Sequence, residues 1–239
     1  MNDENYIPNG PVIVTEDLWR TYREGTHQEV HALRGVNLSI NAGSYFAVKG
    51  RSGSGKTTLL NCIGGLDRPT KGLVRVFSVD LKDLKDKELT RFYRQNVGFI
   101  FQAFGLSPIY TARENVEIVL QIAGKSRKER RERAEYCLEL VGLTKWKNHR
   151  INELSGGQQQ RIAIARSLAN QPRMILADEP TGKLDTATAR EIFSLFRQIV
   201  EHEHITVLMA AHDPLVDEYV DAVMQLKDGQ IVTPSKGNL

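Results

Sequence analysis

The stretch GRSGSGKTT, residues 50–58, decides the fold predicted for this chain. It fits the pattern G-x-x-x-x-G-K-[ST], in which glycines let successive backbone N–H groups face a phosphate and the loop leads into a helix N-terminus. A short buried strand is predicted before it, at 45–48, and a helix after it, at 59–66. Strand, loop and helix together predict a cradle for nucleotide phosphates. Its predicted contacts are Gly50, Arg51, Ser52, Gly53, Ser54, Gly55, Lys56, Thr57 and Thr58.

Two side chains of this loop have specific expected partners. Lys56 would reach the β- and γ-phosphates, and the Thr57 hydroxyl would hold Mg²⁺. The alternative is that these residues form a glycine-rich loop that binds no ligand. The strand and the helix predicted on either side make that alternative weaker.

An apolar strand that ends in two carboxylates is predicted far downstream of the loop. Residues 174–177 are apolar, and Asp178 and Glu179 follow directly. Taken alone, such a strand end is more often simply solvated. Because ligands bind at the carboxyl ends of parallel strands, acids placed there would lie beside the phosphate loop. We expect Asp178 to support Mg²⁺ and Glu179 to polarise the water that attacks the γ-phosphate.

The pentapeptide LSGGQ, residues 154–158, resembles the signature of ATP-binding-cassette (ABC) ATPases, and the resemblance covers nearly the whole chain. Ser155 and the amides of two glycines at the start of a predicted helix form a second anion site. A Ser-capped helix with a glycine turn is the plainer alternative. One chain does not need two γ-phosphate cradles. The resemblance implies that ATP bound to the opposite subunit is contacted by Ser155, Gly156, Gly157 and Gln158, in a homodimer with two shared ATP sites.

The resemblance implies roles for three further residues. Gln102, at the end of FIFQ, matches the glutamine that touches Mg²⁺ and the attacking water and links the nucleotide to the helical subdomain. His212 matches the switch histidine, whose imidazole donates a hydrogen bond to the γ-phosphate. Asp185 matches the aspartate that communicates across the dimer. The catalytic residues are thus predicted to be Glu179, His212 and Gln102, and the metal ligands Thr57, Gln102 and Asp178.

The base-binding aromatic is less well defined by the sequence. Tyr22 resembles the aromatic on which adenine stacks, while Trp19 is close enough to compete for that role, and Tyr22 could instead simply anchor the small sheet. The histidines other than His212 are read as surface or loop residues: His27, His31, His149, His202 and His204.

The expected fold class is α/β. Strands that alternate with helices predict a mainly parallel sheet with helices on both faces. The resemblance implies a RecA-like P-loop NTPase core with an N-terminal antiparallel β-subdomain and an inserted helical subdomain. Within a single domain, 11–239, the expected parts are the antiparallel sheet at 11–43, the core at 44–102 and 156–239, and the helical subdomain at 103–155.

Composition narrows the class of protein further. A net charge of +3 gives no global argument for a nucleic-acid partner, and no stretch approaches the roughly 18 apolar residues of a membrane span. Residues 1–10 are polar and acidic, so we expect a disordered tail and no secretory signal. Cys62 and Cys137 lack a partner at disulfide or metal-ligand spacing, which indicates two small buried hydrophobes.

Several segments resemble the branch of lipoprotein-release and macrolide-export ATPases, among them TARENV at 111–116 and the QQQR that ends at residue 161. The expected function is ATP binding and hydrolysis that powers export or extracytoplasmic mechanical work by integral transmembrane permease subunits. The expected location is the cytoplasmic face of the plasma (inner) membrane, through that partner. The alternative is a soluble ABC ATPase that acts on nucleic acid or ribosomes, although no nucleic-acid motif is present.

Two charged features remain open in the sequence. Lys49 stands where an aliphatic residue usually precedes the loop, and it would either add positive potential near the phosphates or snorkel out of the strand edge. The basic run at 125–133 would either touch anionic lipid or form a solvated helix paired with its interleaved Glu129 and Glu132, which we favour. Lys183 and Ala211 also depart from the usual residues, without removal of a catalytic group.

Overall fold

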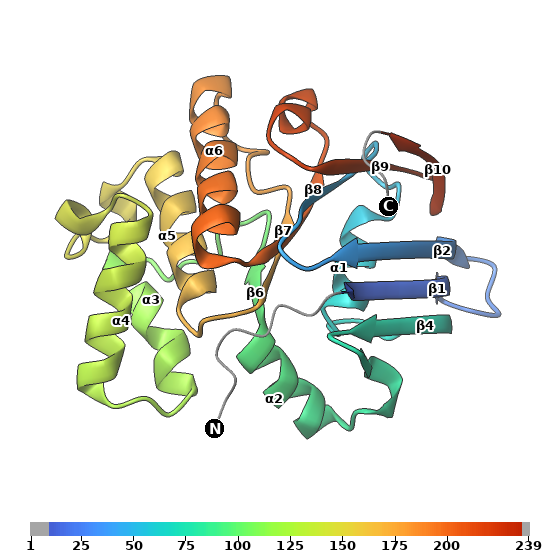
Figure 1. The fold of residues 1–239 in the computed structure, drawn as a ribbon, viewed down its shortest axis with the longest axis horizontal. Coiled ribbons are helices and arrows are strands. Elements are labelled where there is room, and N and C mark those ends of the chain that lie inside the picture. Colours follow the sequence, from blue (N-terminus) through green and yellow to red (C-terminus); the bar gives the residue numbers. More distant parts are fainter. Residues whose placement is uncertain (1–9, 236–239) are drawn as a thin grey trace.

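A computed structural model describes residues 10–235 of the chain. All but the last residue of the predicted N-terminal tail, 1–10, therefore lies outside the described residues. Two sheets and the helices around them make up the described part (Figure 1). The strands are β1 (Pro11–Tyr22), β2 (Val30–Asn41), β3 (Tyr45–Lys49), β4 (Lys71–Val76), β5 (Val79–Asp80), β6 (Val97–Ile100), β7 (Met174–Asp178), β8 (Thr206–Ala211), β9 (Ala222–Lys227) and β10 (Gln230–Ser235).

The helices alternate with these strands along the chain. The α-helices are α1 (Lys56–Ile63), α2 (Asp86–Asn96), α3 (Ala112–Ile122), α4 (Arg127–Leu140), α5 (Gly156–Leu168) and α6 (Thr186–Glu203). The short 3-10 helices are η1 (Leu81–Asp83), η2 (Thr144–Trp146), η3 (Ile151–Glu153) and η4 (Pro214–Glu218). None of the helices in the described range 10–235 is long and apolar enough to cross a membrane.

The larger sheet has the strand order β10-β9-β3-β8-β7-β6. Every neighbouring pair in it is parallel except β9 and β10, which form an antiparallel hairpin. Parallel strands require crossover connections, and α1, α5 and α6 supply them here. The α/β fold class predicted from the alternation of strands and helices is confirmed.

The smaller sheet is antiparallel and has the order β2-β1-β4-β5. Ile13 of β1 lies opposite Ile40 of β2 and Val76 of β4, so β1 lies between these two strands. Residues 71–80 thus join the antiparallel sheet, although the predicted boundaries counted them within the core segment 44–102. Their alternation of buried Val74 and Val76 with more exposed neighbours is the period-2 signal that the sequence interpretation overlooked.

Three helices, α3, α4 and α5, gather on the side of the molecule opposite the small sheet (Figure 1). Their starts are fixed locally by capping boxes. The Thr111 hydroxyl accepts from the Glu114 amide at 3.2 Å while the Glu114 carboxylate accepts from the Thr111 amide at 2.8 Å, and Ser126 and Glu129 repeat the arrangement before α4. Reciprocal caps of this kind hold a helix start without tertiary help.

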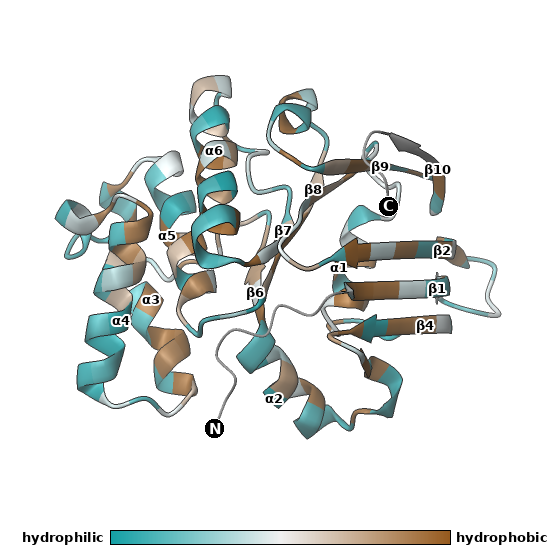
Figure 2. Cartoon of the chain, in the orientation of Figure 1, coloured by the Kyte–Doolittle hydropathy of each residue, from teal (hydrophilic) through white to brown (hydrophobic). Residues whose placement is uncertain are grey.

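The core is split by the parallel sheet into two layers. Side chains of a strand alternate between faces, so Tyr45 and Ala47 pack with α3 to α6, whereas Phe46 and Val48 pack with α1 and the small sheet. Figure 2 shows hydrophobic residues along the central strands and a mostly hydrophilic α4 at the outside. The parallel sheet that leads into the phosphate loop is thereby covered on both faces by hydrophobic side chains.

Candidate active site

The ends of four neighbouring strands bring the predicted catalytic residues to one edge of the parallel sheet. β3 leads into the phosphate loop, β8 into His212, β7 into Glu179 and β6 into Gln102. Because these strands are adjacent and parallel, residues more than a hundred positions apart become neighbours. The topology places four predicted elements of the chemistry in one row.

The phosphate loop adopts backbone conformations that favour glycine. Gly53 and Gly55 have φ of 79° and 105°, and a Cβ at Gly55 would lie 2.4 Å from the carbonyl oxygen of Ala32. Lys56 is 4% exposed and its ammonium donates to the carbonyl oxygens of Gly50 at 2.9 Å and Arg51 at 3.2 Å. The buried Ser54 hydroxyl has no hydrogen-bond partner among residues 10–235. The loop therefore offers preformed donors for phosphate oxygens.

Thr57 and Asp178 meet at the beginning of α1. The Thr57 hydroxyl donates to the Asp178 carboxylate, with distances of 2.9 Å to Oδ2 and 3.2 Å to Oδ1. Burial raises the pKa of Asp178, an effect that the Thr57 hydrogen bond opposes and the neighbouring Glu179 charge reinforces. A hydroxyl beside a carboxylate is the oxygen donor set that Mg²⁺ prefers.

The carboxylate of Glu179 lies close to three other polar side chains of the site. Its Oε1 lies 3.2 Å from the Lys56 ammonium, its Oε2 accepts from the Gln102 amide at 3.1 Å, and the same oxygen is 3.7 Å from Nδ1 of His212. Glu179 also has φ of 45°, a left-handed conformation that costs energy for a residue with a side chain. Its backbone amide donates to the carbonyl of Ala210 at 3.0 Å, which holds it in that position.

A cleft of about 590 Å³ lies at this edge of the sheet. Its lining includes the predicted site residues Lys56, Thr57, Thr58, Gln102 and Glu179 but neither Asp178 nor His212, and it also includes residues that the sequence interpretation missed. The missed residues are Glu29, which precedes β2, then Val30, His31, Ala32 and Arg34 at the start of β2, and Asp228 and Gly229 from the β9–β10 turn. The residues around the start of β2 form no recognisable sequence motif, so only the fold shows that they lie beside the phosphate loop.

The β9–β10 turn supports the phosphate loop from behind. The Gly229 amide donates to the carbonyl of Ser54 at 3.0 Å, and its own carbonyl accepts from the Arg34 amide at 2.8 Å. A Cβ at Gly229 would come within 2.8 Å of the Ala32 carbonyl oxygen. The C-terminal hairpin thus ties the small sheet to the loop through a glycine that the chain requires there.

Tyr22 and Trp19 both lie beside the cleft without lining it. The Tyr22 hydroxyl donates to Asp67, and the Arg20 guanidinium lies 4.4 Å above the Tyr22 ring. Burial and the Asp67 hydrogen bond raise the pKa of the Tyr22 phenol, while a hydrogen bond with Thr58, which does line the cleft, lowers it. The indole of Trp19 donates to Asp17 at 2.7 Å instead. Tyr22 therefore adjoins the phosphate loop, whereas the Trp19 ring meets the His31 ring of β2 edge-on, with 6.5 Å between the ring centroids.

The signature residues form a separate group at the N-terminus of α5, among the helices opposite the small sheet (Figure 1). Ser155 caps the helix, since its hydroxyl accepts from the Gln158 amide at 3.3 Å while its own amide donates to the Gln158 side chain at 2.9 Å. A Cβ at Gly157 would lie 2.6 Å from Cγ2 of Thr188, so α5 approaches α6 closely there. None of these residues lines the cleft at Lys56.

Asp185 caps α6 next to this group. Its carboxylate accepts from the Thr188 hydroxyl at 2.6 Å and from the Thr188 amide at 3.0 Å, and these bonds lower its pKa. Through Thr188, Asp185 is connected to the glycines at the start of α5.

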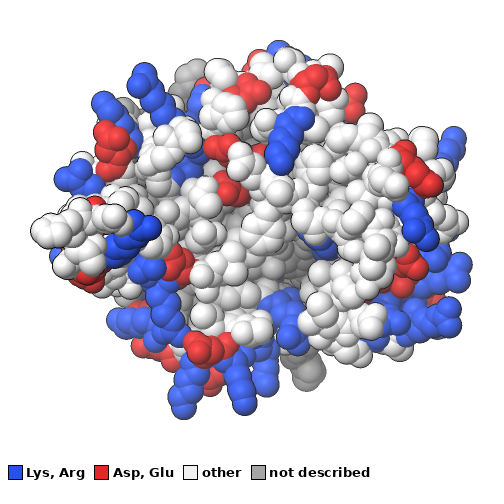
Figure 3. All heavy atoms as spheres, turned by 180° about the vertical axis from the view of Figure 1, so that it is seen from behind, with Lys and Arg blue, Asp and Glu red and all other residues white. Residues whose placement is uncertain are grey.

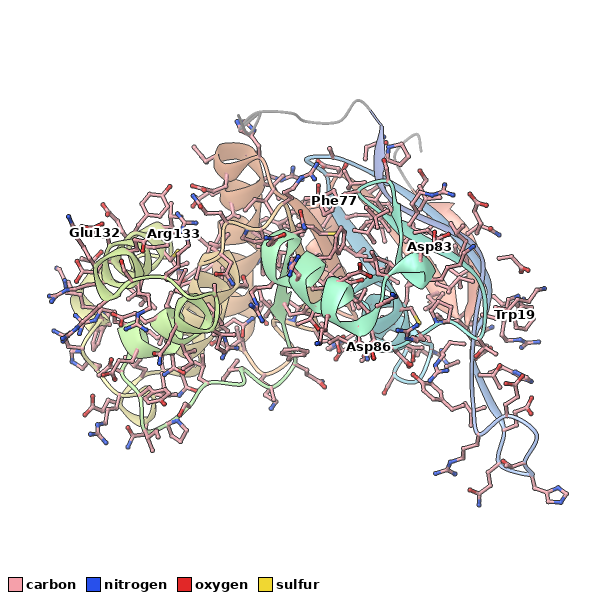
Figure 4. All side chains as sticks on the ribbon, turned by 90° about the horizontal axis from the view of Figure 1, so that it is seen from below. Trp19, Phe77, Asp83, Asp86, Glu132 and Arg133 are labelled. Atoms are coloured by element: carbon pink, nitrogen blue, oxygen red, sulfur yellow. The ribbon has the colours of Figure 1, made fainter. Side chains whose placement is uncertain are left out.

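The structure also shows the contacts of Lys49 and of the basic run at 125–133, whose roles the sequence left open. Lys49 forms an ion pair with Asp217 of η4, and both carboxylate oxygens lie 2.9 Å from its ammonium. This ion pair is neither of the two roles that the sequence left open for Lys49, contact with the phosphates or extension into solvent. In the basic run, Lys128 and Glu132 pair at i,i+4, as the solvated-helix interpretation requires. Figure 3 shows basic side chains along the lower edge of the molecule with acidic ones among them, and Figure 4 shows Glu132 at the outside of α4.

Both cysteines are buried and unbridged, as predicted. Burial raises the pKa of the Cys62 thiol to about 12 and that of Cys137 to about 11, so both remain neutral thiols at physiological pH.

Known proteins resemble this chain over most of its length. The sequence profile of the ABC transporter family matches residues 33–182. An uncharacterised ABC transporter ATP-binding protein of Methanocaldococcus jannaschii is 44% identical over 229 residues, which are 94% of this chain and 97% of the relative. A solved dimeric structure of that cassette, in a post-hydrolysis state bound to ADP and Pi, has a TM-score of 0.85 at 43% identity and covers 94% of this chain and 98% of its own.

Two further relatives have a named transport system. The lipoprotein-releasing system ATP-binding protein of Legionella pneumophila is 40% identical over 93% of this chain and 98% of its own. The macrolide export ATP-binding/permease protein of Rhodopirellula baltica is 47% identical over 90% of this chain, which matches 31% of that longer protein. Both similarities extend across the phosphate loop and the signature segment.

Proposed function

The chain belongs to the ABC transporter family and is an ATP-binding and ATP-hydrolysing subunit of a transporter; from this premise we propose how its own residues serve the reaction. The observation that carries the proposal is the convergence of Lys56, Gln102 and His212 on the single carboxylate of Glu179. A general base must lie within reach of the groups that bind the phosphate and the water, and this arrangement provides it.

Glu179 takes the proton of the attacking water as the water oxygen bonds to the γ-phosphorus. The bond from that phosphorus to the bridging β-phosphate oxygen breaks, which yields ADP and inorganic phosphate. Lys56 and His212 donate hydrogen bonds to the charge that develops on the phosphoryl oxygens. Gln102 orients the water and connects the site with the segment that leads to α3.

The residues present fit Mg²⁺ as a cofactor. Thr57 and Asp178 form an oxygen donor pair, and we propose that they hold the ion together with Gln102 and phosphate oxygens of the nucleotide. Mg²⁺ would neutralise charge on the β- and γ-phosphates.

We propose further that two copies of the chain share two ATP sites. Ser155, Gly156, Gly157 and Gln158 would contact the γ-phosphate bound at the partner's phosphate loop, with Asp185 at the contact between subunits. Three things support this: the signature lies apart from the cleft, it begins a capped helix, and a relative at 43% identity forms a dimer.

Integral transmembrane permease subunits are the proposed partners, with this chain on the cytoplasmic face of the plasma membrane. The relatives named for lipoprotein release and macrolide export support a role in export or mechanical work outside the membrane. The rival function, a soluble ATPase of nucleic acid or ribosomes, has no comparable support from the relatives.

The experiment that tests this function combines two readouts. The tagged chain, purified from solubilised membranes, is expected to bring a stoichiometric integral membrane protein and to hydrolyse MgATP in a Lys56-dependent manner. Recovery with ribosomes or DNA in place of a membrane protein would contradict the transport role. MgATP hydrolysis that survives Lys56→Ala would contradict the assigned site.

A further inference from the structure

A carboxylate at the far end of the phosphate-loop helix carries four hydrogen bonds. Asp67 accepts from Arg20 twice, from Nε at 2.9 Å and Nη2 at 2.7 Å, in the bidentate geometry that gives both strength and direction. It also accepts from the Arg68 amide at 2.9 Å and from the Tyr22 hydroxyl. All its acceptor positions are therefore used, which fixes the side chain in one orientation.

This carboxylate is rigidly attached to α1. The amides of Leu66 and Asp67 donate to the carbonyl of Asn61 at 2.9 and 3.2 Å, which turns the chain back onto the helix that starts at Lys56. The phosphate loop and Asp67 thus stand at the two ends of one short rigid segment. A side chain that is hydrogen-bonded to Asp67 therefore keeps a fixed position relative to the phosphate loop.

Arg20 contacts Tyr22 in a second way. The two residues point to the same face of β1 because they are two positions apart, and the Arg20 guanidinium lies over the Tyr22 ring at 4.4 Å. A cation over an aromatic face is favourable and directional. It covers one face of the ring, so a stacked base must take the opposite face. Neither Arg20 nor Asp67 lines the cleft.

We propose that Asp67 and Arg20 are positioning residues for the nucleotide base, which hold the Tyr22 ring in the orientation in which adenine stacks on it. The inference rests on the proposed role of Tyr22. Asp67 fixes the hydroxyl end of the ring, Arg20 fixes its plane, and α1 keeps both in register with the phosphate loop. The pair therefore acts on the recognition of the base and leaves the phosphate chemistry untouched.

The test compares ATP with a ligand that lacks a base. Steady-state hydrolysis by the full chain gives KM and kcat for ATP, and magnesium tripolyphosphate serves as a competitive inhibitor. For Asp67→Asn, which keeps the shape and loses the charge, we expect KM to rise about tenfold, the usual scale of a lost charged hydrogen-bond network. We expect kcat and the tripolyphosphate inhibition constant to stay within about twofold of wild type, since neither depends on the base.

The matched control is Asp86→Asn, the same substitution in the ion pair with Arg68 at the beginning of α2, labelled in Figure 4. That pair is highly exposed, and we expect all three constants to stay at the wild-type values. Arg20→Lys, which keeps the positive charge without the fork, provides a second variant should Asp67→Asn fold poorly. It is expected to raise KM for ATP by a smaller factor.

A double-mutant cycle distinguishes the positioning role of Asp67 from the proposed stacking role of Tyr22. If Asp67 acts through Tyr22, adding Asp67→Asn to Tyr22→Ala changes KM no further. Equal weakening of ATP and tripolyphosphate, additive effects with Tyr22→Ala, or an unchanged KM in Asp67→Asn would each overturn the positioning role. An unchanged KM in Tyr22→Ala alone would instead remove Tyr22 as the adenine platform, and the inference with it.

Discussion

The ammonium of Lys56 lies 3.2 Å from Oε1 of Glu179, and this ion pair joins the phosphate loop to the carboxyl end of β7. Lys56 is almost fully buried, and its other two hydrogen-bond acceptors are backbone carbonyls of its own loop. A buried ammonium is stable only when it is paired in this way. Lys56, the proposed phosphate ligand, and Glu179, the proposed general base, are therefore coupled directly by an ion pair.

The first prediction concerns the charge of that base. Glu179→Gln keeps the size of the side chain and an acceptor for Lys56, but it cannot take a proton from water. We expect the rate of MgATP hydrolysis to fall by about a hundredfold or more, with the affinity for MgATP largely retained. Single-turnover hydrolysis and equilibrium nucleotide binding measure the two quantities separately. Hydrolysis at the wild-type rate would show that another group activates the water.

The second prediction concerns the buried acid beside Thr57. Because burial raises the folded-state pKa of Asp178 above its unfolded value, the folded protein binds more protons than the unfolded chain between those two pKa values. Stability therefore falls as the pH rises through that window, and the cost is fully present at neutral pH. We expect nucleotide-free Asp178→Asn to melt at a higher temperature than wild type at pH 7.

The difference in melting temperature between Asp178→Asn and wild type should shrink as the pH is lowered toward 4. The same variant should lose the stabilisation that MgATP gives to wild type, because one of the proposed metal ligands has lost its charge. Thermal unfolding across pH, with and without MgATP, measures both effects. A variant that melts lower than wild type at neutral pH would show that Asp178 stabilises the fold.

The third prediction concerns the close approach of α5 and α6. A Cβ at Gly157 would lie 2.6 Å from the Thr188 methyl group, and the Thr188 side chain is held by Asp185 and cannot easily turn away. Gly157→Ala should lower the free energy of unfolding by about 1–3 kcal/mol, the usual cost of overpacking. Denaturant unfolding measures it.

A paired rescue and control make this test specific. Thr188→Ser removes the methyl group and keeps the hydroxyl that donates to Asp185, so it should recover most of the stability lost in Gly157→Ala. Gly156→Ala is the matched control, because its Cβ would be at an ordinary 3.4 Å from Leu184. If Gly157→Ala and Gly156→Ala were equally stable, the close approach would not matter.

The fourth prediction concerns Lys49, which the sequence alone left between two roles. Its ammonium pairs with Asp217, whose side chain is 50% exposed, so solvent screens the interaction. We expect Lys49→Met and Asp217→Asn to change the free energy of unfolding by less than about 1 kcal/mol and to leave KM for ATP unchanged. A large rise of KM in Lys49→Met alone would assign Lys49 to the phosphates.

Much of this site could be predicted because its parts are local motifs. The run from Gly50 to Thr57 and the pair Asp178 and Glu179 each combine a strand end with the side chains that the chemistry requires, so sequence and topology agree. The start of the helix after Ser155 was likewise predicted, and α5 begins there at Gly156.

The remainder depends on long-range contacts that leave no local pattern. Gly229 supports the phosphate loop from a hairpin about 175 residues away, and His31, interpreted as an ordinary surface residue, borders the cleft because β2 runs past the loop. Such contacts are set by tertiary packing. The strands at 71–76 and 79–80 are a different case, because the alternation at Val74 and Val76 is a local signal that the sequence interpretation overlooked.

The central claim is that two copies of this chain close around shared ATP, and the oligomeric state of Glu179→Gln tests it most directly. Size-exclusion chromatography with light scattering is expected to show a monomer without nucleotide and a stable dimer with MgATP. Adding Ser155→Arg, which places a bulky side chain at the signature, should abolish the dimer while each chain still binds ATP. A Glu179→Gln variant that binds MgATP and remains monomeric at every protein concentration tested would contradict the shared-site account.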